Sequence, residues 1–138
     1  SSDIGMDAVE NSISGNMDTN VFSMIDSLGR NRKDEAYQML HNLLVSGEQV
    51  YKLLALLCSH FEIILSVKEM REEGKSFAEM KDILGIHEFR IKKAASFAEK
   101  YSLQSLRQIL QRAYEIDKNI KTGLLESSLA LELFIAGI

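Results

Sequence analysis

The chain has 138 residues, 46% of them hydrophobic and 26% charged, and contains no proline. This composition is typical of one soluble globular domain, and the absence of the residue that breaks helix interiors favours an all-α fold. The formal net charge of -4 argues against a dedicated nucleic-acid-binding domain, which usually has a basic face. The single cysteine, Cys58, excludes an intrachain disulfide and indicates a reducing, cytoplasmic setting.

Helices are predicted to follow one another closely along the chain. Residues 1–17 carry one short amphipathic stretch, which we interpret as the tail of a preceding domain or a linker. Residues 18–138 are then one domain, a compact bundle of about six to seven helices. Helix caps and single glycines place these helices at about 18–29, 32–46, 48–73, 76–85, 87–100, 102–121 and 126–136.

The segment 48–73 is the longest predicted helix. Its polar residues fall on one narrow line and the remaining sides are largely apolar, so it must be covered on most sides and is predicted to be central. Its most apolar window, 50–67, is interrupted by Lys52, Ser59, His60 and Glu62, which argues against a membrane span.

Motifs for catalysis and for cofactor or metal binding are absent from the sequence. Neither nucleotide-binding glycine fingerprint occurs. His41, His60 and His87 have no second ligand at metal-binding spacing. The carboxylate pairs Glu72-Glu73 and Glu79 with Asp82 lie near helix ends, where surface charge is the simpler interpretation. We therefore predict no catalytic residues, no cofactor and no metal.

A possible helix-turn-helix spans residues 76–95. Two short helices are joined at Gly85, and the second carries Arg90, Lys92 and Lys93, which in a DNA-binding version would meet phosphates or base edges. Two helices joined through glycine are also common in bundles. The residues alone leave both interpretations open.

The final helix, 126–136, is apolar on nearly every side. It is either buried within the domain or half exposed to a partner protein. Since 48–73 already supplies one central helix, the partner interpretation gains weight.

Four ordered segments resemble the C-terminal domain of the bacterial DNA polymerase III delta subunit. They are NVFSMIDSLG at 20–29, LLALLCSHFEIIL at 53–65, EGKSFAEMKDILGIHEFRIKKAASFAEKYS at 73–102 and AYEIDKNIKTGLLESSLALELFI at 113–135. The resemblance implies the helical collar domain of a five-subunit clamp loader in the bacterial cytoplasm. Residues 1–17 would then end the preceding lid domain, and the segment around Gly85 would belong to the collar fold.

The resemblance also implies partners. These are clamp-loader subunits of the gamma/tau and delta-prime type, which associate through the collar. The sliding clamp would be reached only through an N-terminal module that this sequence lacks, and DNA only indirectly or weakly. No ATP hydrolysis and no membrane are implied.

Two hypotheses follow from the sequence. The first is a collar domain that assembles by helix packing and buries apolar surface within a polar rim. Its candidate interface residues are Leu103, Leu106, Ile109, Leu129, Leu133 and Phe134. The second is a helix-turn-helix DNA-binding module that uses Arg90, Lys92 and Lys93.

Overall fold

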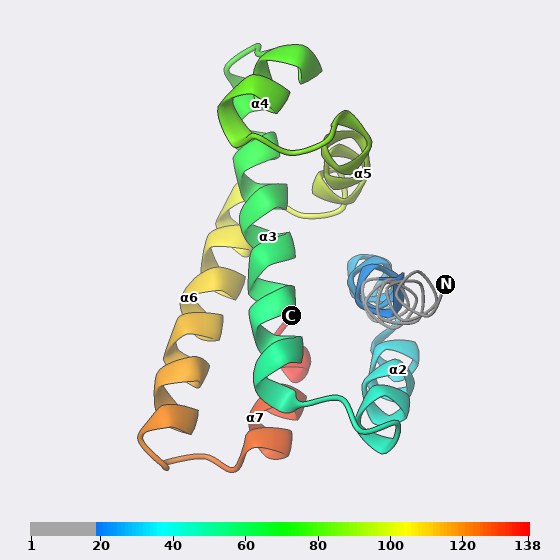
Figure 1. Cartoon of the computed structure of the whole chain (residues 1–138), viewed down its shortest axis with the longest axis vertical. Helices are drawn as coiled ribbons and strands as arrows, with labels where there is room; N and C mark the ends of the chain where they lie inside the picture. Colours follow the sequence, from blue (N-terminus) through cyan, green and yellow to red (C-terminus); the bar gives the residue numbers. More distant parts are fainter. Residues whose placement is uncertain (1–18) are drawn as a thin grey trace, which may run out of the picture.

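The computed structural model describes residues 19–138, and in that range it is built of α-helices without β-strands (Figure 1). The predicted all-α bundle is confirmed for this part of the chain. The predicted boundary after residue 17 and the short stretch before it lie outside the described residues. Residues 19–29 are helical, followed by α2 (Lys33–Val45), α3 (Val50–Glu72), α4 (Phe77–Leu84), α5 (Glu88–Ala98), α6 (Leu103–Lys121) and α7 (Ser127–Ala136).

The predicted central position of α3 is confirmed. α3 packs against α5, α6 and α7, and α6 runs antiparallel beside it (Figure 1). Its side chains Leu53, Leu57, Phe61 and Ile64 are each at most 1% exposed. Two further helices pack on those that contact α3: α4 packs on α5 at one end of the molecule, and α2 packs on α7 at the other. One continuous core results.

Local sequence signals define most helix ends. Ser76 and Glu79 form the predicted capping box, in which the Ser76 hydroxyl accepts the Glu79 amide and the Glu79 carboxylate accepts the Ser76 amide. Ser102 caps α6 by accepting the amide of Ser105 at 3.0 Å. These caps satisfy amides that have no partner within the helix.

The first helix ends at Gly29, as its sequence predicts. The left-handed residue that redirects the chain is Asn31, with φ of 65°. Asn tolerates this conformation better than most residues. Gly29 instead allows a close approach, since a Cβ there would lie 3.1 Å from the Lys100 side chain and 3.3 Å from the Tyr101 ring, and both side chains would have to shift by a few tenths of an ångström.

The connection between α5 and α6 fastens helix 19–29 to the core. The Tyr101 hydroxyl donates a hydrogen bond to the Ile25 carbonyl at 2.8 Å, and its ring meets Phe61 edge-on at 5.7 Å between centroids. The Lys100 ammonium pairs with Asp26, and this contact lowers the pKa of the Asp26 carboxyl. Two adjacent residues thus contact one helix, one through a buried hydrogen bond and the other through a surface ion pair.

The core predicts a clear difference between two truncations. Phe61→Ala removes a fully buried ring and should lower the free energy of unfolding by about 3–5 kcal/mol. Val45→Ala changes a side chain that is 72% exposed and should stay within about 0.5 kcal/mol of the parent. Urea unfolding followed by circular dichroism measures both, and similar losses for the two variants would contradict this description of the core.

Tyr101 predicts a loss of stability at alkaline pH. Burial raises the pKa of its hydroxyl above the ordinary value of 10.0, so the folded state holds this proton more tightly than the unfolded state. The resulting stabilisation is complete below pH 10 and is lost as the pH rises further. Tyr101→Phe should cost about 1 kcal/mol at pH 7 through the lost hydrogen bond.

Unfolding of both proteins between pH 8 and 11.5 tests this expectation. Stability should fall more steeply in the parent above pH 10, so that the gap between the two proteins narrows. Parallel profiles over that range would show that Tyr101 ionises alike in the folded and unfolded states.

Candidate subunit interface

The six predicted interface residues divide into three groups. Leu106, Ile109 and Phe134 are at most 5% exposed, so they belong to the core of the domain and not to its surface. The reason is that α6 and α7 turn these side chains inward beside α3. Leu103, at the start of α6, is half-buried. Only Leu129 and Leu133 remain at the surface, at 46% and 43% exposed.

The sequence left open whether α7 is buried or half exposed, and the structure shows that one face of the helix is buried and the other is exposed. Ala130, Leu131, Phe134 and Ile135 face the core, and the helix packs against α2, α3 and α6. Leu129 and Leu133 are four residues apart and so share its outer face. We call this pair the α7 stripe.

Side chains from other helices fix the position of α7. Lys33 donates to the Ala136 carbonyl at 2.8 Å, Tyr37 to Glu132 at 3.3 Å and Arg112 to Leu133 at 2.9 Å. Two of these groups are cations at the end of a helix where the dipole is negative. Lys33 gives the terminal Ala136 carbonyl a partner, whereas the Leu133 carbonyl also accepts the Gly137 amide at 3.2 Å.

The first turn of α7 is held by Glu126. Its carboxylate accepts the amides of Ser128 and Leu129, both at 3.0 Å, and the Ser128 amide contributes most to lowering the pKa of this carboxyl. The backbone that carries the α7 stripe is thus anchored at both ends, a property that favours a preformed contact surface.

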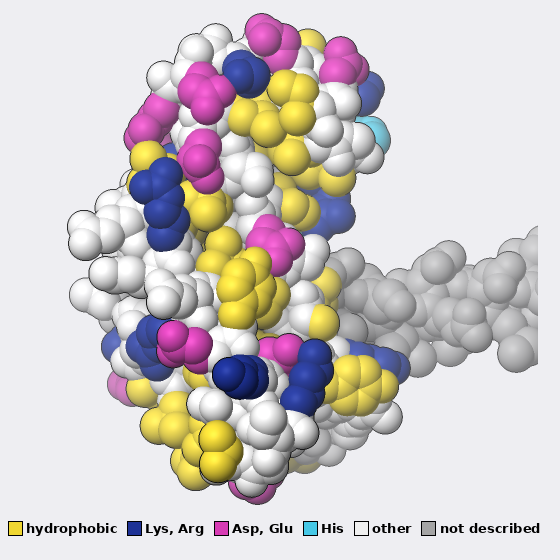
Figure 2. Space-filling model, turned by 90° about the vertical axis from the view of Figure 1, so that its left-hand side faces the viewer, with side chains coloured by type: hydrophobic (Ala, Val, Ile, Leu, Met, Phe, Trp, Pro, Cys, Tyr) yellow, Lys and Arg dark blue, Asp and Glu magenta, His cyan; other side chains and the backbone are white. Residues whose placement is uncertain are grey.

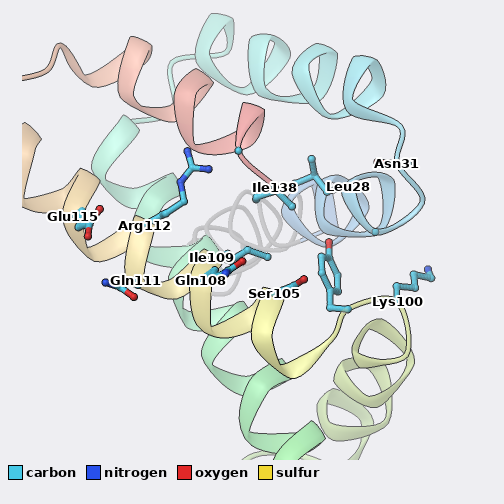
Figure 3. Close-up of a pocket in the computed structure, with 13 residues that line it drawn as sticks. Leu28, Asn31, Lys100, Ser105, Gln108, Ile109, Gln111, Arg112, Glu115 and Ile138 are labelled. Atoms are coloured by element: carbon cyan, nitrogen blue, oxygen red, sulfur yellow. The ribbon is translucent and has the colours of Figure 1, made fainter.

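A pocket of about 670 Å³ lies between helix 19–29, α6 and the end of α7 (Figure 3). Figure 3 shows Arg112 extending from α6 toward the end of α7, while Gln108 and Glu115 of the same helix line the wall. Its lining combines the amides of Gln108 and Gln111, the Glu115 carboxylate and the cations Lys100 and Arg112. Arg112 joins α6 to α7 through its hydrogen bond to the Leu133 carbonyl.

The residues of the possible helix-turn-helix are arranged for packing. Lys92 pairs with Glu88 at 3.7 Å, and the Lys93 ammonium lies 5.4 Å from the Phe22 ring centroid and 5.8 Å from that of Phe89. Arg90 is partly buried beside a small cavity lined also by Phe97. The opposite face of α5 packs on α3. The three cations therefore do not form one free basic surface.

The histidines lie apart from one another. His41 is exposed on α2, His60 is buried in α3 beside the Phe22 ring, and His87 caps α5 by accepting the Phe89 amide at 3.0 Å. Among residues 19–138, no group of three His, Cys, Asp or Glu side chains could hold a metal ion. The predicted surface carboxylates Glu72 and Asp82 are exposed.

By length and composition alone, α3 is long and apolar enough to cross a membrane. The sequence analysis had argued against a membrane span because polar residues interrupt this segment. Its contacts explain the apolar character in another way. Three helices pack against α3, and its buried side chains are apolar apart from His60. A buried core helix passes the same test of hydropathy.

Four of the eight exposed large hydrophobic side chains in the described residues, Val45, Tyr51, Leu124 and Leu129, lie near the helix connections at one end of the molecule. This is the end where α2 leads into α3 and α6 leads into α7, at the bottom of Figure 1, whereas α4 and α5 lie at the other end. The full set in the described residues is Val45, Tyr51, Ile83, Phe89, Tyr114, Leu124, Leu129 and Leu133. The sequence analysis named neither Tyr51 nor Tyr114 as a candidate interface residue.

A family model described as the C-terminal domain of the DNA polymerase III delta subunit matches residues 18–138. The chain belongs to this family. Among curated proteins, the DNA polymerase III subunit delta of Bacillus subtilis (strain 168) is 30% identical over 133 residues, which cover 96% of this chain and 38% of that protein. The chain thus spans well under half the length of this delta-subunit relative.

A solved structure shows the same fold. The Bacillus subtilis DNA clamp loader delta protein superposes with a TM-score of 0.84 at 30% sequence identity, over 88% of this chain and 36% of that one. The helical arrangement described above is therefore that of the delta C-terminal domain, and the resemblance proposed from the four sequence segments is confirmed.

The contact between Arg112 and Gly137 predicts an energetic coupling. A Cβ at Gly137 would lie 1.2 Å from an Arg112 guanidinium nitrogen, so Gly137→Ala must displace the guanidinium from α7. Arg112→Ala should lower the free energy of unfolding by about 0.5–1 kcal/mol. Once Arg112 is absent, Gly137→Ala should be neutral or slightly stabilising, because alanine restricts the unfolded chain.

A double-mutant cycle measured by urea unfolding tests this coupling. The expected coupling energy is about 0.5–1 kcal/mol. Equal effects of Gly137→Ala in the presence and absence of Arg112 would show that the two residues act independently.

Proposed function

We propose that this chain is the collar domain of a clamp-loader delta subunit, which joins that subunit to the other members of the complex. The partners are subunits of the gamma/tau and delta-prime type, and the setting is the bacterial cytoplasm. Membership of the delta C-terminal domain family supports this function, as does the likeness to the clamp loader delta protein.

The observation that carries the proposal is the α7 stripe. Leu129 and Leu133 stay about half exposed on a helix whose other face is core. Full burial of a leucine side chain is worth about 1.5–3 kcal/mol relative to exposure, so covering the remaining half of both would contribute about 2 kcal/mol to an association. The anchored ends of α7 reduce the ordering that such a contact requires.

The DNA-binding alternative receives less support. Lys92 and Lys93 already have partners on their own domain, and Phe89, which would lie beside them in a groove-reading helix, is 65% exposed and apolar. We infer that any DNA contact of this domain is indirect or weak. Contact with the sliding clamp would belong to the part of the delta subunit that lies outside this domain.

Assembly with purified clamp-loader subunits of the same organism tests the proposed function. The chain should co-elute with them in size-exclusion chromatography with light scattering. Leu129→Asp combined with Leu133→Asp should weaken this association at least tenfold, since two charges would have to be buried. Ile83→Asp, at an equally exposed site on α4, serves as the matched control.

The outcomes separate clearly. No association of the parent chain with any of these subunits would overturn the collar function. Association that is equally tight in the double variant would remove α7 from the interface and leave the function itself intact.

A further inference from the structure

A second surface, distinct from the α7 stripe, lies between α3 and α6. A groove of about 340 Å³ runs along these two antiparallel helices toward the end where α6 leads into α7. Its two large exposed side chains are Tyr51, at 63%, and Tyr114, at 54%. Ala55 and the half-buried Cys58 add apolar surface above the buried Leu54. α7 contributes nothing to it.

Figure 2 shows the side of the molecule on which α6 and α3 lie. Hydrophobic side chains there are interspersed with acidic and basic ones. This mixture is typical of an interface with apolar anchors and a polar rim. Tyrosine is a favoured anchor because it offers a large contact area with few rotatable bonds.

Of the charged side chains that line the groove, two form an ion pair with each other and Glu62 does not take part in it. Lys121 pairs with Asp117 at 2.7 Å, so these two neutralise each other. Glu62 instead accepts a hydrogen bond from the Tyr114 hydroxyl at 2.7 Å, and among residues 19–138 no lysine or arginine forms an ion pair with it. This contact raises the pKa of the Tyr114 hydroxyl, so Tyr114 stays a neutral donor and the negative charge of Glu62 remains.

This charge selects among possible occupants. A second copy of the chain also has a formal net charge of -4, and if it paired groove to groove it would bring another Glu62 and Asp117 against the first. Residues 1–18 contain four carboxylates and no lysine or arginine, so they offer no cation to Glu62. The complementary occupant is a helix from a different protein that combines an apolar stripe with lysine or arginine.

We propose that the groove between α3 and α6 binds a basic amphipathic helix of a neighbouring clamp-loader subunit. Tyr51 and Tyr114 form the apolar contact, and Glu62 pairs with a lysine or arginine of that helix. This inference rests on the proposed collar function and extends it, because it gives the domain a second contact surface and states the chemistry of the segment that covers it.

Substitutions in the groove test the proposal in the complex with the purified subunits. Tyr51→Ala and Tyr114→Ala should each raise the dissociation constant about tenfold, the size expected for a tyrosine anchor. Glu62→Gln should raise it severalfold at low salt and little at high salt, because the lost interaction is ionic. Phe89→Ala is the matched control, since this ring is equally exposed on α5 at the other end.

Cys58 provides a readout that needs no substitution. It is the only cysteine of the chain and lines the groove. Burial raises the pKa of its thiol to about 11, so labelling by a maleimide is slow but measurable at pH 8.5. Mass spectrometry of the Cys58 peptide should show labelling at least tenfold slower in the complex than in the free chain.

Each outcome decides for or against the proposal. Slower Cys58 labelling together with weaker binding of the tyrosine variants supports it. A complex in which Cys58 reacts at the free rate and the tyrosine variants bind normally overturns it and leaves the collar function standing. If Cys58 labelling slows as the concentration of the chain is raised without any other subunit, a second copy of the chain occupies the groove and the proposal is overturned. Failure of the parent chain to join the complex overturns both.

Discussion

Along α3, apolar side chains occupy almost every side, and water cannot be excluded from such a helix by a single neighbour. Three helices are needed, and α5, α6 and α7 supply them. Phe61 and Leu57 lie at the centre of this contact, each at most 1% exposed. Burial of that surface is the largest favourable term available to a small helical domain. The remaining helices then pack on the three that surround α3.

Hydrophobic burial brings the outer helices to the core, and specific polar contacts then determine their positions on it. Tyr101 holds the backbone of helix 19–29 through one buried hydrogen bond, and Arg112 ties the end of α7 to α6. Hydrophobic burial has little directionality, so without such contacts the outer helices could slide on the core. The contacts at both ends of α7 also keep the α7 stripe at the surface.

The apolar surface that the fold leaves exposed includes two separate regions. The α7 stripe and the groove between α3 and α6 lie on different helices, and neither depends on a residue of the other. One carries aliphatic side chains and the other carries two tyrosines beside a carboxylate. Two surfaces of different chemistry are suited to two different partner segments, as the two proposals above require.

The amino-acid sequence by itself determined the helices, their approximate ends and the central place of α3. These features depend on local signals, such as the Ser76–Glu79 capping box, and on the period of apolar residues, which is fixed within each helix. Ordered sequence segments were likewise sufficient to indicate the delta C-terminal domain family. No tertiary information was needed for either step.

The tertiary structure alone decided which apolar side chains are core and which are surface. Phe134 and Leu133 are adjacent on one helix, yet the first is 1% exposed and the second 43%. A helix that is apolar on every side has no periodicity from which its buried face could be read, so Phe134 was wrongly grouped with Leu129 and Leu133. Leu106 and Ile109 lie on the amphipathic helix α6, and the structure turns the apolar face of that helix toward the core and not toward a partner. The groove of Tyr51 and Tyr114 could not be predicted from the sequence either. Residues of both α3 and α6 form it, so it exists only where the fold places these two helices side by side.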